Sequence, residues 1–159
     1  MTMDCEGHVD RNGAARMADV AGKEPSRRTA EASGRISLGP AAARAVLDGS
    51  AAKGDVLAVA RVGAIQAVKR TWETIPMCHP VRIGGVEIEL LPDPEGVTAS
   101  CRVTGVDSTG FEMEALHGVT VALLIVYDMT KSLERGMVIS GVRLLAKSGG
   151  KSGEYRWRG

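Results

Sequence analysis

Hydrophobic and polar residues alternate along two neighbouring stretches in the middle of the chain. Residues 86–90 read Val-Glu-Ile-Glu-Leu, and residues 97–104 alternate again after a turn rich in proline and glycine. A period of two is typical of strands with one buried face, so these stretches predict an antiparallel hairpin. A shorter alternating stretch at residues 35–38 predicts another strand, and residues 137–146 predict a final one.

Three other segments have the composition of helices. Residues 41–47 are mostly alanine and follow Pro40, which suits a first helical position because its N–H group would lack a partner there. Residues 54–75 carry an acid near their start and bases towards their end, as the helix dipole favours, and Gly63 among them indicates close packing. The most apolar run lies within residues 114–134, which predict a long helix.

The order of these elements indicates an α+β sandwich, with helices packed on one face of an antiparallel sheet. Residues 1–33 are polar, small and charged without a sustained period, so we expect an extended or partly disordered N-terminal arm. Residues 34–159 then form a single domain that is large enough to bury a core.

Composition excludes several classes of protein. A net charge of +1 and only five aromatic residues argue against a dedicated nucleic-acid binder, which needs basic charge and stacking surfaces. Cys5, Cys78 and Cys101 are odd in number and form no CxxC motif, so a reducing compartment is expected. The apolar runs look too short to span a bilayer, and no signal peptide is evident. We therefore expect a soluble, cytoplasmic protein.

Charged residues stand at both ends of the long apolar run. Glu112 and Glu114 precede it, and Asp128 and Lys131 follow it, although ionised groups beside a buried element are costly unless paired or used. At about 100° per residue, Glu114 and Asp128 fall on nearly the same helix face, and Asp128 and Lys131 are i,i+3 neighbours. On these residues alone, solvated helix ends with an ordinary ion pair remain an alternative to a catalytic site.

Lysines beside glycines suggest a site for an anion. Lys147 and Lys151 enclose two glycines within residues 147–153, where backbone N–H groups can point together at an anion. The segment is not a P-loop, because the required earlier glycine is missing and no helix follows. Lys53 opens the second predicted helix, another place where N–H groups and a lysine can meet an anion. A solvated tail and an ordinary surface lysine are the alternatives.

His79 lies between Cys78 and Pro80 in a connection stiffened by proline. Because imidazole titrates near neutrality, a rigidly held histidine can act as a donor or as a general acid or base. A capping or core histidine is the common alternative, and a zinc site of Cys78, His79, Cys101 and His117 has no supporting spacing. Together with the lysines and carboxylates, the constellation fits acid–base rearrangement of a phosphorylated small molecule.

Seven segments together resemble the molybdenum cofactor biosynthesis protein C family, the cyclic pyranopterin monophosphate synthases. They occur in the family's order and cover nearly everything from about residue 16 onward, which makes the match far more specific than any single motif. The segments are residues 53–55, 63–67, 69–71, 75–80, 109–116, 126–129 and 147–153. One departure is Arg16, which stands where the family usually has histidine.

The resemblance implies a ferredoxin-like fold, with residues 34–159 as the catalytic domain, and a homohexamer built as a trimer of dimers with active sites at dimer interfaces. The implied reaction converts (8S)-3′,8-cyclo-7,8-dihydroguanosine 5′-triphosphate to cyclic pyranopterin monophosphate and diphosphate, and it consumes no redox cofactor. We predict no cofactor and assign no residue as a metal ligand, while the sequence leaves a requirement for a divalent metal open. By motif match, Asp128 and Lys131 are the catalytic residues. The implied substrate-binding residues are Met77, Cys78, His79, Glu112, Met113, Glu114, Lys53, Lys147, Lys151 and Arg28.

Two other functions compete with this one. An inactive phosphate-ligand-binding or scaffold protein of the same fold would keep Lys53, Lys147 and Lys151 but would not need Asp128 or Lys131. A nucleic-acid module that uses the basic tail is disfavoured by the neutral charge and the scarcity of aromatic residues. We expect neither a nucleic acid nor a membrane as a partner.

Overall fold

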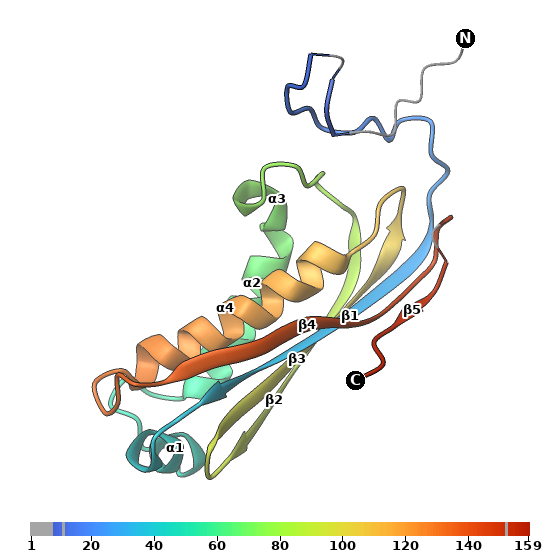
Figure 1. Ribbon diagram of the computed structural model, residues 1–159. Helices are drawn as coiled ribbons and strands as arrows, with labels where there is room; N and C mark the ends of the chain where they lie inside the picture. Colours follow the sequence, from blue (N-terminus) through green and yellow to red (C-terminus); the bar gives the residue numbers. More distant parts are fainter. Residues whose placement is uncertain (1–7, 11, 152) are drawn as a thin grey trace.

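The computed structural model describes residues 8–10, 12–151 and 153–159. Cys5 therefore lies outside the described residues. Figure 1 shows one sheet with its helices gathered on one side. The strands are β1 Ser26–Ser37, β2 Ile83–Asp93, β3 Gly96–Asp107, β4 Val138–Ser148 and β5 Tyr155–Arg156, and the helices are α1 Pro40–Leu47, α2 Val56–Lys69, α3 Thr71–Thr74 and α4 Glu112–Thr130.

The five strands form one sheet in the order β2-β3-β1-β4-β5, and every neighbouring pair is antiparallel. Without the two-residue β5, the chain runs strand, helices, strand, strand, helix, strand with β1 and β3 in the centre. This arrangement is the ferredoxin-like split βαβ topology. The predicted α+β fold is confirmed, and so is the hairpin of β2 and β3.

The helix-facing side of the sheet carries small or β-branched residues. Ala30, Ala32, Gly34 and Ile36 of β1 are buried, while the residues that alternate with them face the other side of the sheet. Alanine leaves room for a helix to approach closely, and α4 packs against both central strands. Gly63 of α2 lies against the side chain of Ile125 in α4, so the close packing expected there is confirmed.

α4 is the central helix of the core. By length and composition it could cross a membrane, so our expectation that every apolar run is too short was wrong. In the fold, however, Ala115, Val119, Ala122, Leu123 and Val126 are at most 1% exposed, because the sheet and α2 cover them. A core helix passes the same length and composition test as a membrane span.

Two predicted boundaries need correction, and one strand was missed. β1 begins at Ser26 rather than near residue 35, so residues 26–33, which we placed in the arm, pair with β3 and β4. Alanine, serine and threonine give β1 little hydrophobic alternation, which explains the error. The single helix expected over residues 54–75 is divided at Arg70 into α2 and α3. β5 was not predicted, because two residues carry no readable period.

Candidate active site

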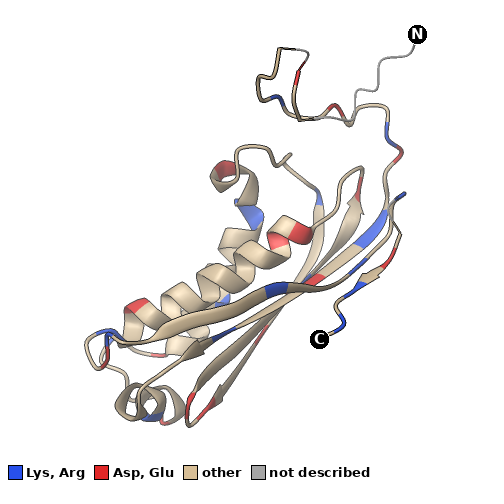
Figure 2. Ribbon diagram, in the orientation of Figure 1, with Lys and Arg blue, Asp and Glu red and all other residues tan. Residues whose placement is uncertain are grey.

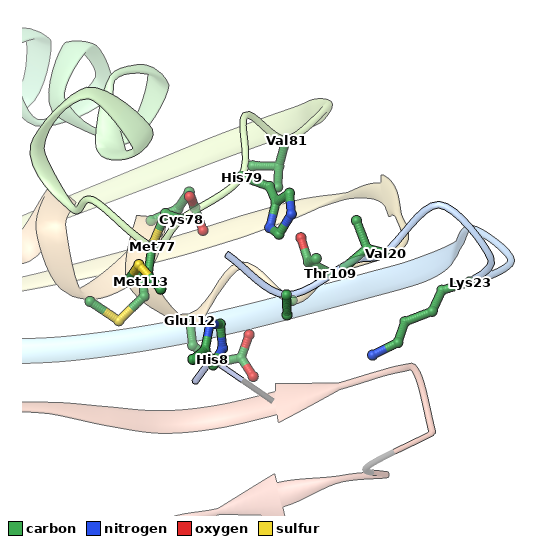
Figure 3. Close-up of a pocket in the computed structure, with 13 residues that line it drawn as sticks. His8, Val20, Lys23, Met77, Cys78, His79, Val81, Thr109, Glu112 and Met113 are labelled. Atoms are coloured by element: carbon green, nitrogen blue, oxygen red, sulfur yellow. The ribbon is translucent and has the colours of Figure 1, made fainter. Parts of the chain in front are cut away.

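A pocket of about 260 Å³ lies at the N-terminal end of α4 (Figure 3). Three segments line it: the first turn of α4 with the loop before it, the connection after α3, and the N-terminal segment before β1. Figure 3 shows His79 pointing inward, with the two methionines together on one side and Lys23 on the other. Six residues of the predicted substrate-binding set line this pocket: Met77, Cys78, His79, Glu112, Met113 and Glu114.

The core fixes the first turn of α4. Phe111, the residue before the helix, is fully buried, and its ring packs on β3 at Gly105, where an added Cβ would lie 2.7 Å from the ring. α3, which leads into the connection that lines the pocket, is also tied to α4, because Thr71 Oγ1 and His117 Nδ1 lie 3.2 Å apart. Two of the three lining segments are therefore anchored at or beside α4.

Glu114 is the most perturbed carboxyl group in the pocket. It is only 3% exposed, and desolvation, with smaller effects from the charges of Glu112 and Asp107, raises its pKa to about 7. Burial, with the Glu114 charge, also raises the pKa of the Cys78 thiol. Near neutral pH the pocket therefore holds a protonated thiol and a carboxyl group that both binds and releases a proton.

A second cavity, of about 960 Å³, adjoins the first and shares Lys23, Thr109, Gly110 and Glu112 with it. Two predicted phosphate-binding residues, Arg28 and Lys151, line this second cavity. Lys147 lines neither cavity, but its Nζ lies 2.8 Å from Glu112 Oε1. Cationic side chains are thus gathered on one side of the pocket that contains the titrating groups.

Arg28 also fixes residues 149–151, the glycine-rich segment beside the second cavity. Its guanidinium donates to the main-chain oxygens of Asp107 and Ser108, at 2.9 and 3.0 Å. Gly149 and Gly150 cross the same arginine with φ angles of +91° and +75°, and a Cβ on either glycine would collide with residues 27–28. Only glycine combines this close approach with a left-handed backbone.

A separate charged cluster occupies the C-terminal end of α4. Asp128 accepts from Lys53 Nζ through Oδ2 and from Lys131 Nζ through Oδ1, each at 2.7 Å. These hydrogen bonds, first from Lys131 and then from Lys53, lower the Asp128 pKa to about 2. The predicted i,i+3 pair is confirmed. Lys53, which we grouped with the phosphate-binding lysines, pairs with Asp128 and lines neither of the two cavities.

The predicted site residues therefore form two groups rather than one. No Lys, Arg, Asp or Glu lies in α4 between Glu114 and Asp128, and Figure 2 shows charge at both ends of the helix with none between. From Glu112 to Asp128 the helix advances about 24 Å, at about 1.5 Å per residue. A shared helix face does not bring Glu114 and Asp128 together: Glu114 is buried and Asp128 is half exposed.

The pocket also includes residues that sequence reasoning missed. Lys23 and Thr109 line both cavities, and His8 and Val81 line the smaller one. Lys23 and His8 come from the segment that we read as an arm, where no period or motif marks a lining residue. Thr109 lies within a segment that carries the family resemblance, so that position offered a signal.

The described residues contain no group of three or more histidine, cysteine, aspartate or glutamate side chains arranged to hold a metal ion. Cys101, a member of the zinc alternative, is fully buried on the sheet, and burial raises its pKa to about 12. Its sulfur belongs to the core and faces Gly118 of α4.

Fold and site together define a ferredoxin-like α+β protein in which a pocket with a titrating carboxyl group adjoins a cavity lined by three basic and two acidic side chains. The chain belongs to the MoaC family, which it matches over residues 17–150. It is 49% identical to the cyclic pyranopterin monophosphate synthase of Pelotomaculum thermopropionicum, over 96% of this chain and 91% of the relative. It is 51% identical to that of Methylobacterium nodulans and 50% identical to that of Methylobacterium sp. strain 4-46, over 93% of this chain and 94% of each relative. The resemblance read from the sequence is confirmed.

Proposed function

We propose that this chain is a cyclic pyranopterin monophosphate synthase of molybdenum cofactor biosynthesis. It converts (8S)-3′,8-cyclo-7,8-dihydroguanosine 5′-triphosphate to cyclic pyranopterin monophosphate and diphosphate. The observation that carries the proposal is the junction of the two cavities at Glu112. One cavity holds titrating groups suited to a pterin ring, and the other is lined by Lys23, Arg28 and Lys151, which suit a triphosphate.

The phosphate chemistry follows from the cationic cavity. An oxygen of the substrate attacks the innermost phosphorus, the bond to the outer two phosphates breaks, and diphosphate leaves with its negative charge. Arg28 and Lys151 would bind that charge as it develops, and Lys147, held by Glu112, would approach from β4. Fixing the attacking and leaving groups in one geometry lowers the barrier further.

The ring chemistry needs protons moved at fixed positions. Purine ring opening and pterin closure exchange protons at nitrogen and carbon, and each well-placed acid or base contributes roughly 10²–10⁴-fold. Glu114, with a pKa of about 7, and His79 in the same pocket are suited to this exchange. Asp128 and Lys131 act as the catalytic pair, with Lys53 holding the aspartate in place.

The pair and the pocket meet in an assembly of several copies. Because about 24 Å of helix separates the two groups in one chain, one small substrate does not contact both. A second copy would bring its Asp128 and Lys131 to the pocket of the first. Large apolar side chains on the outer surface of the helices, Val62 at 68% and Leu124 at 51% exposed, support such an interface. We propose a hexamer arranged as a trimer of dimers with shared sites.

The setting we propose is the cytoplasm. Both described cysteines, Cys78 and Cys101, are free thiols, which suits a reducing compartment.

The direct test is conversion of the purified cyclic dihydro-GTP intermediate. We expect mass spectrometry to show cyclic pyranopterin monophosphate and an equal amount of diphosphate, and Asp128→Asn to yield neither at a comparable rate. Light scattering should give a mass well above the 16.7 kDa of one chain. Tight substrate binding without any product would favour the alternative of a non-catalytic ligand-binding or scaffold protein. A monomer at working concentration would refute the shared site.

A further inference from the structure

The chain after the glycine-rich segment returns to the edge of β4 as β5. Tyr155 pairs with Lys147, and Arg156 pairs with Ala146. The Trp157 N–H then donates to the Leu145 main-chain oxygen at 2.8 Å. The ladder is short, and two-stranded pairings of this length are weak by themselves.

A side-chain contact continues the pairing beyond the ladder. The guanidinium carbon of Arg143 lies 4.2 Å from the centroid of the Trp157 ring, which is the geometry of a cation–π interaction. Arg143 belongs to β4 and Trp157 follows β5, so the contact joins the two sides of the hairpin that encloses the glycine-rich segment. This contact adds a side-chain link between the C-terminal residues and the sheet.

The glycines between β4 and β5 lose much backbone freedom when they become ordered. Gly149, Gly150 and Gly153 all adopt positive φ angles, and glycine loses more backbone freedom on ordering than any other residue. Arg28 fixes the start of the segment at Gly149 and Gly150. Lys151, which lines the larger cavity, lies between that fixed point and β5.

Arg143 and Trp157 act without touching the cavity. Arg143 pairs with Ser33, which lies between the helix-facing residues Ala32 and Gly34, so the side chain of Arg143 is on the face of the sheet away from the helices. The cavity and the pair of Glu112 with Lys147 involve α4, which packs on the helix side. These two residues can therefore influence the site only by fixing the backbone between β4 and β5.

We propose that Arg143 and Trp157 are positioning residues for substrate binding. Their stacking closes the hairpin of β4 and β5, which orders the glycine-rich segment and holds Lys151 towards the anionic part of the substrate. The role in binding rests on the proposed function, whereas the ordering of the segment does not. The variants that test it, Trp157→Ala and Arg143→Ala, change exposed side chains, so both proteins should fold.

We expect each variant to raise KM roughly threefold to tenfold while kcat changes by less than about twofold, as suits the loss of one exposed contact that orders a binding segment. The double variant should lose no more than either single variant, because the two residues act through one contact. Trp157→Phe keeps an aromatic face and should retain most of the affinity. Arg158→Ala removes a neighbouring exposed charge and serves as the charge-matched control.

Hydrogen exchange provides a readout that does not need turnover. Peptides covering residues 145–157 should exchange faster in Trp157→Ala and Arg143→Ala than in the unchanged protein, with melting temperatures within about 2 °C of each other. Unchanged exchange, or a KM within twofold of the unchanged protein in both variants, would overturn the proposal. If the unchanged protein itself fails to turn over the cyclic dihydro-GTP intermediate, the proposed function fails, and the exchange result still decides whether the hairpin is closed by this contact.

Discussion

Lys53 binds Asp128 in two ways, because its Nζ lies 2.7 Å from the carboxylate Oδ2 and 2.9 Å from the main-chain oxygen of the same residue. That carbonyl is in the last turn of α4, where main-chain oxygens lack intrahelical partners. One lysine therefore caps the helix and orients the carboxylate that Lys131 also contacts. Substitutions at Lys53 should report on both tasks.

Replacing Asp128 or Lys131 should separate chemistry from folding. We expect Asp128→Asn and Lys131→Ala each to reduce turnover by at least about 10²-fold, the contribution of a well-placed acid–base group. Both side chains are half exposed, so the melting temperature should barely move. Steady-state kinetics and calorimetry on the same preparations check this. Near-normal turnover in either variant would show that the two residues form an ordinary helix-end ion pair without a catalytic role.

Lys53→Ala should differ from those two variants. It should lose activity because Asp128 loses one of its two cationic partners, and its melting temperature should also fall because α4 loses a cap. Lys53→Arg restores the charge but not the compact ammonium that reaches both oxygens, so partial recovery is expected. A melting temperature for Lys53→Ala equal to that of Lys131→Ala would contradict the capping role.

Glu114 should make stability fall as the pH rises. Its folded-state pKa is raised from 4.5 to about 7, so the folded state binds more protons than the unfolded state between those values. The stabilising contribution of Glu114 to the free energy of unfolding is therefore complete below about pH 4.5. It is lost as the pH rises through 7, a change of up to about 3 kcal/mol. Denaturant unfolding at pH 5 and pH 8 should show this loss in the native protein and a much smaller one in Glu114→Gln. Equal pH dependence in both proteins would show that Glu114 is not the responsible group.

The same residue should shape the pH profile of catalysis. Asp128, with a pKa of about 2, stays ionised over the whole working range, whereas Glu114 changes protonation near neutrality. We expect an inflection in kcat/KM near pH 7 that disappears in Glu114→Gln. An inflection that survives this substitution belongs to another group in the pocket.

Lys151→Ala should weaken substrate binding more than it slows chemistry. One lost charge-assisted hydrogen bond corresponds to about 1.5–3 kcal/mol, or roughly tenfold to a hundredfold in affinity. Calorimetric titration with diphosphate, at two salt concentrations, measures the loss and its electrostatic origin. Arg44→Ala is the charge-matched control, since Arg44 lies on α1 and does not line either cavity. Equal affinities for Lys151→Ala and Arg44→Ala would make the glycine-rich segment an ordinary surface loop.

Mixing inactive variants should reveal whether two chains build one site. Asp128→Ala and His79→Ala damage different groups, so a mixed dimer retains one intact site, and random mixing should restore about a quarter of full activity. Asp128→Ala with Lys53→Ala is the informative control, because both changes fall in the same cluster and should restore nothing. Recovery in both mixtures, or in neither, would argue against the shared site.

The sequence predicted the elements that have strong periods and missed those that depend on pairing. The hairpin of β2 and β3 alternates clearly, whereas half of β1 is alanine, serine and threonine, whose burial follows from the strands on either side. β5 consists of two residues held by neighbours. A local sequence pattern does not show which strand a segment will pair with.

Prediction of the site was limited in the same way. Motif matching found Glu112, Glu114, Asp128 and Lys131, but a helical wheel could not show that the first pair is a helix length from the second. Nor could it show that Lys53 pairs with Asp128, since the contact joins residues 75 positions apart. Lys23 was not predicted, because only the path of the N-terminal segment across the fold brings it beside both cavities.

α4 works as a fixed spacer, because one unbroken helix carries Glu112 at its start and Asp128 near its end. A loop could absorb an insertion or a deletion, but a helix of this kind cannot. One added turn would move Asp128 by about 5.4 Å along the axis. Lys53, in the loop between α1 and α2, would stay where it is. The length of α4 should therefore tolerate far less change than the loops around the same fold, and even a conservative insertion within residues 115–127 should break the contact between Lys53 and Asp128.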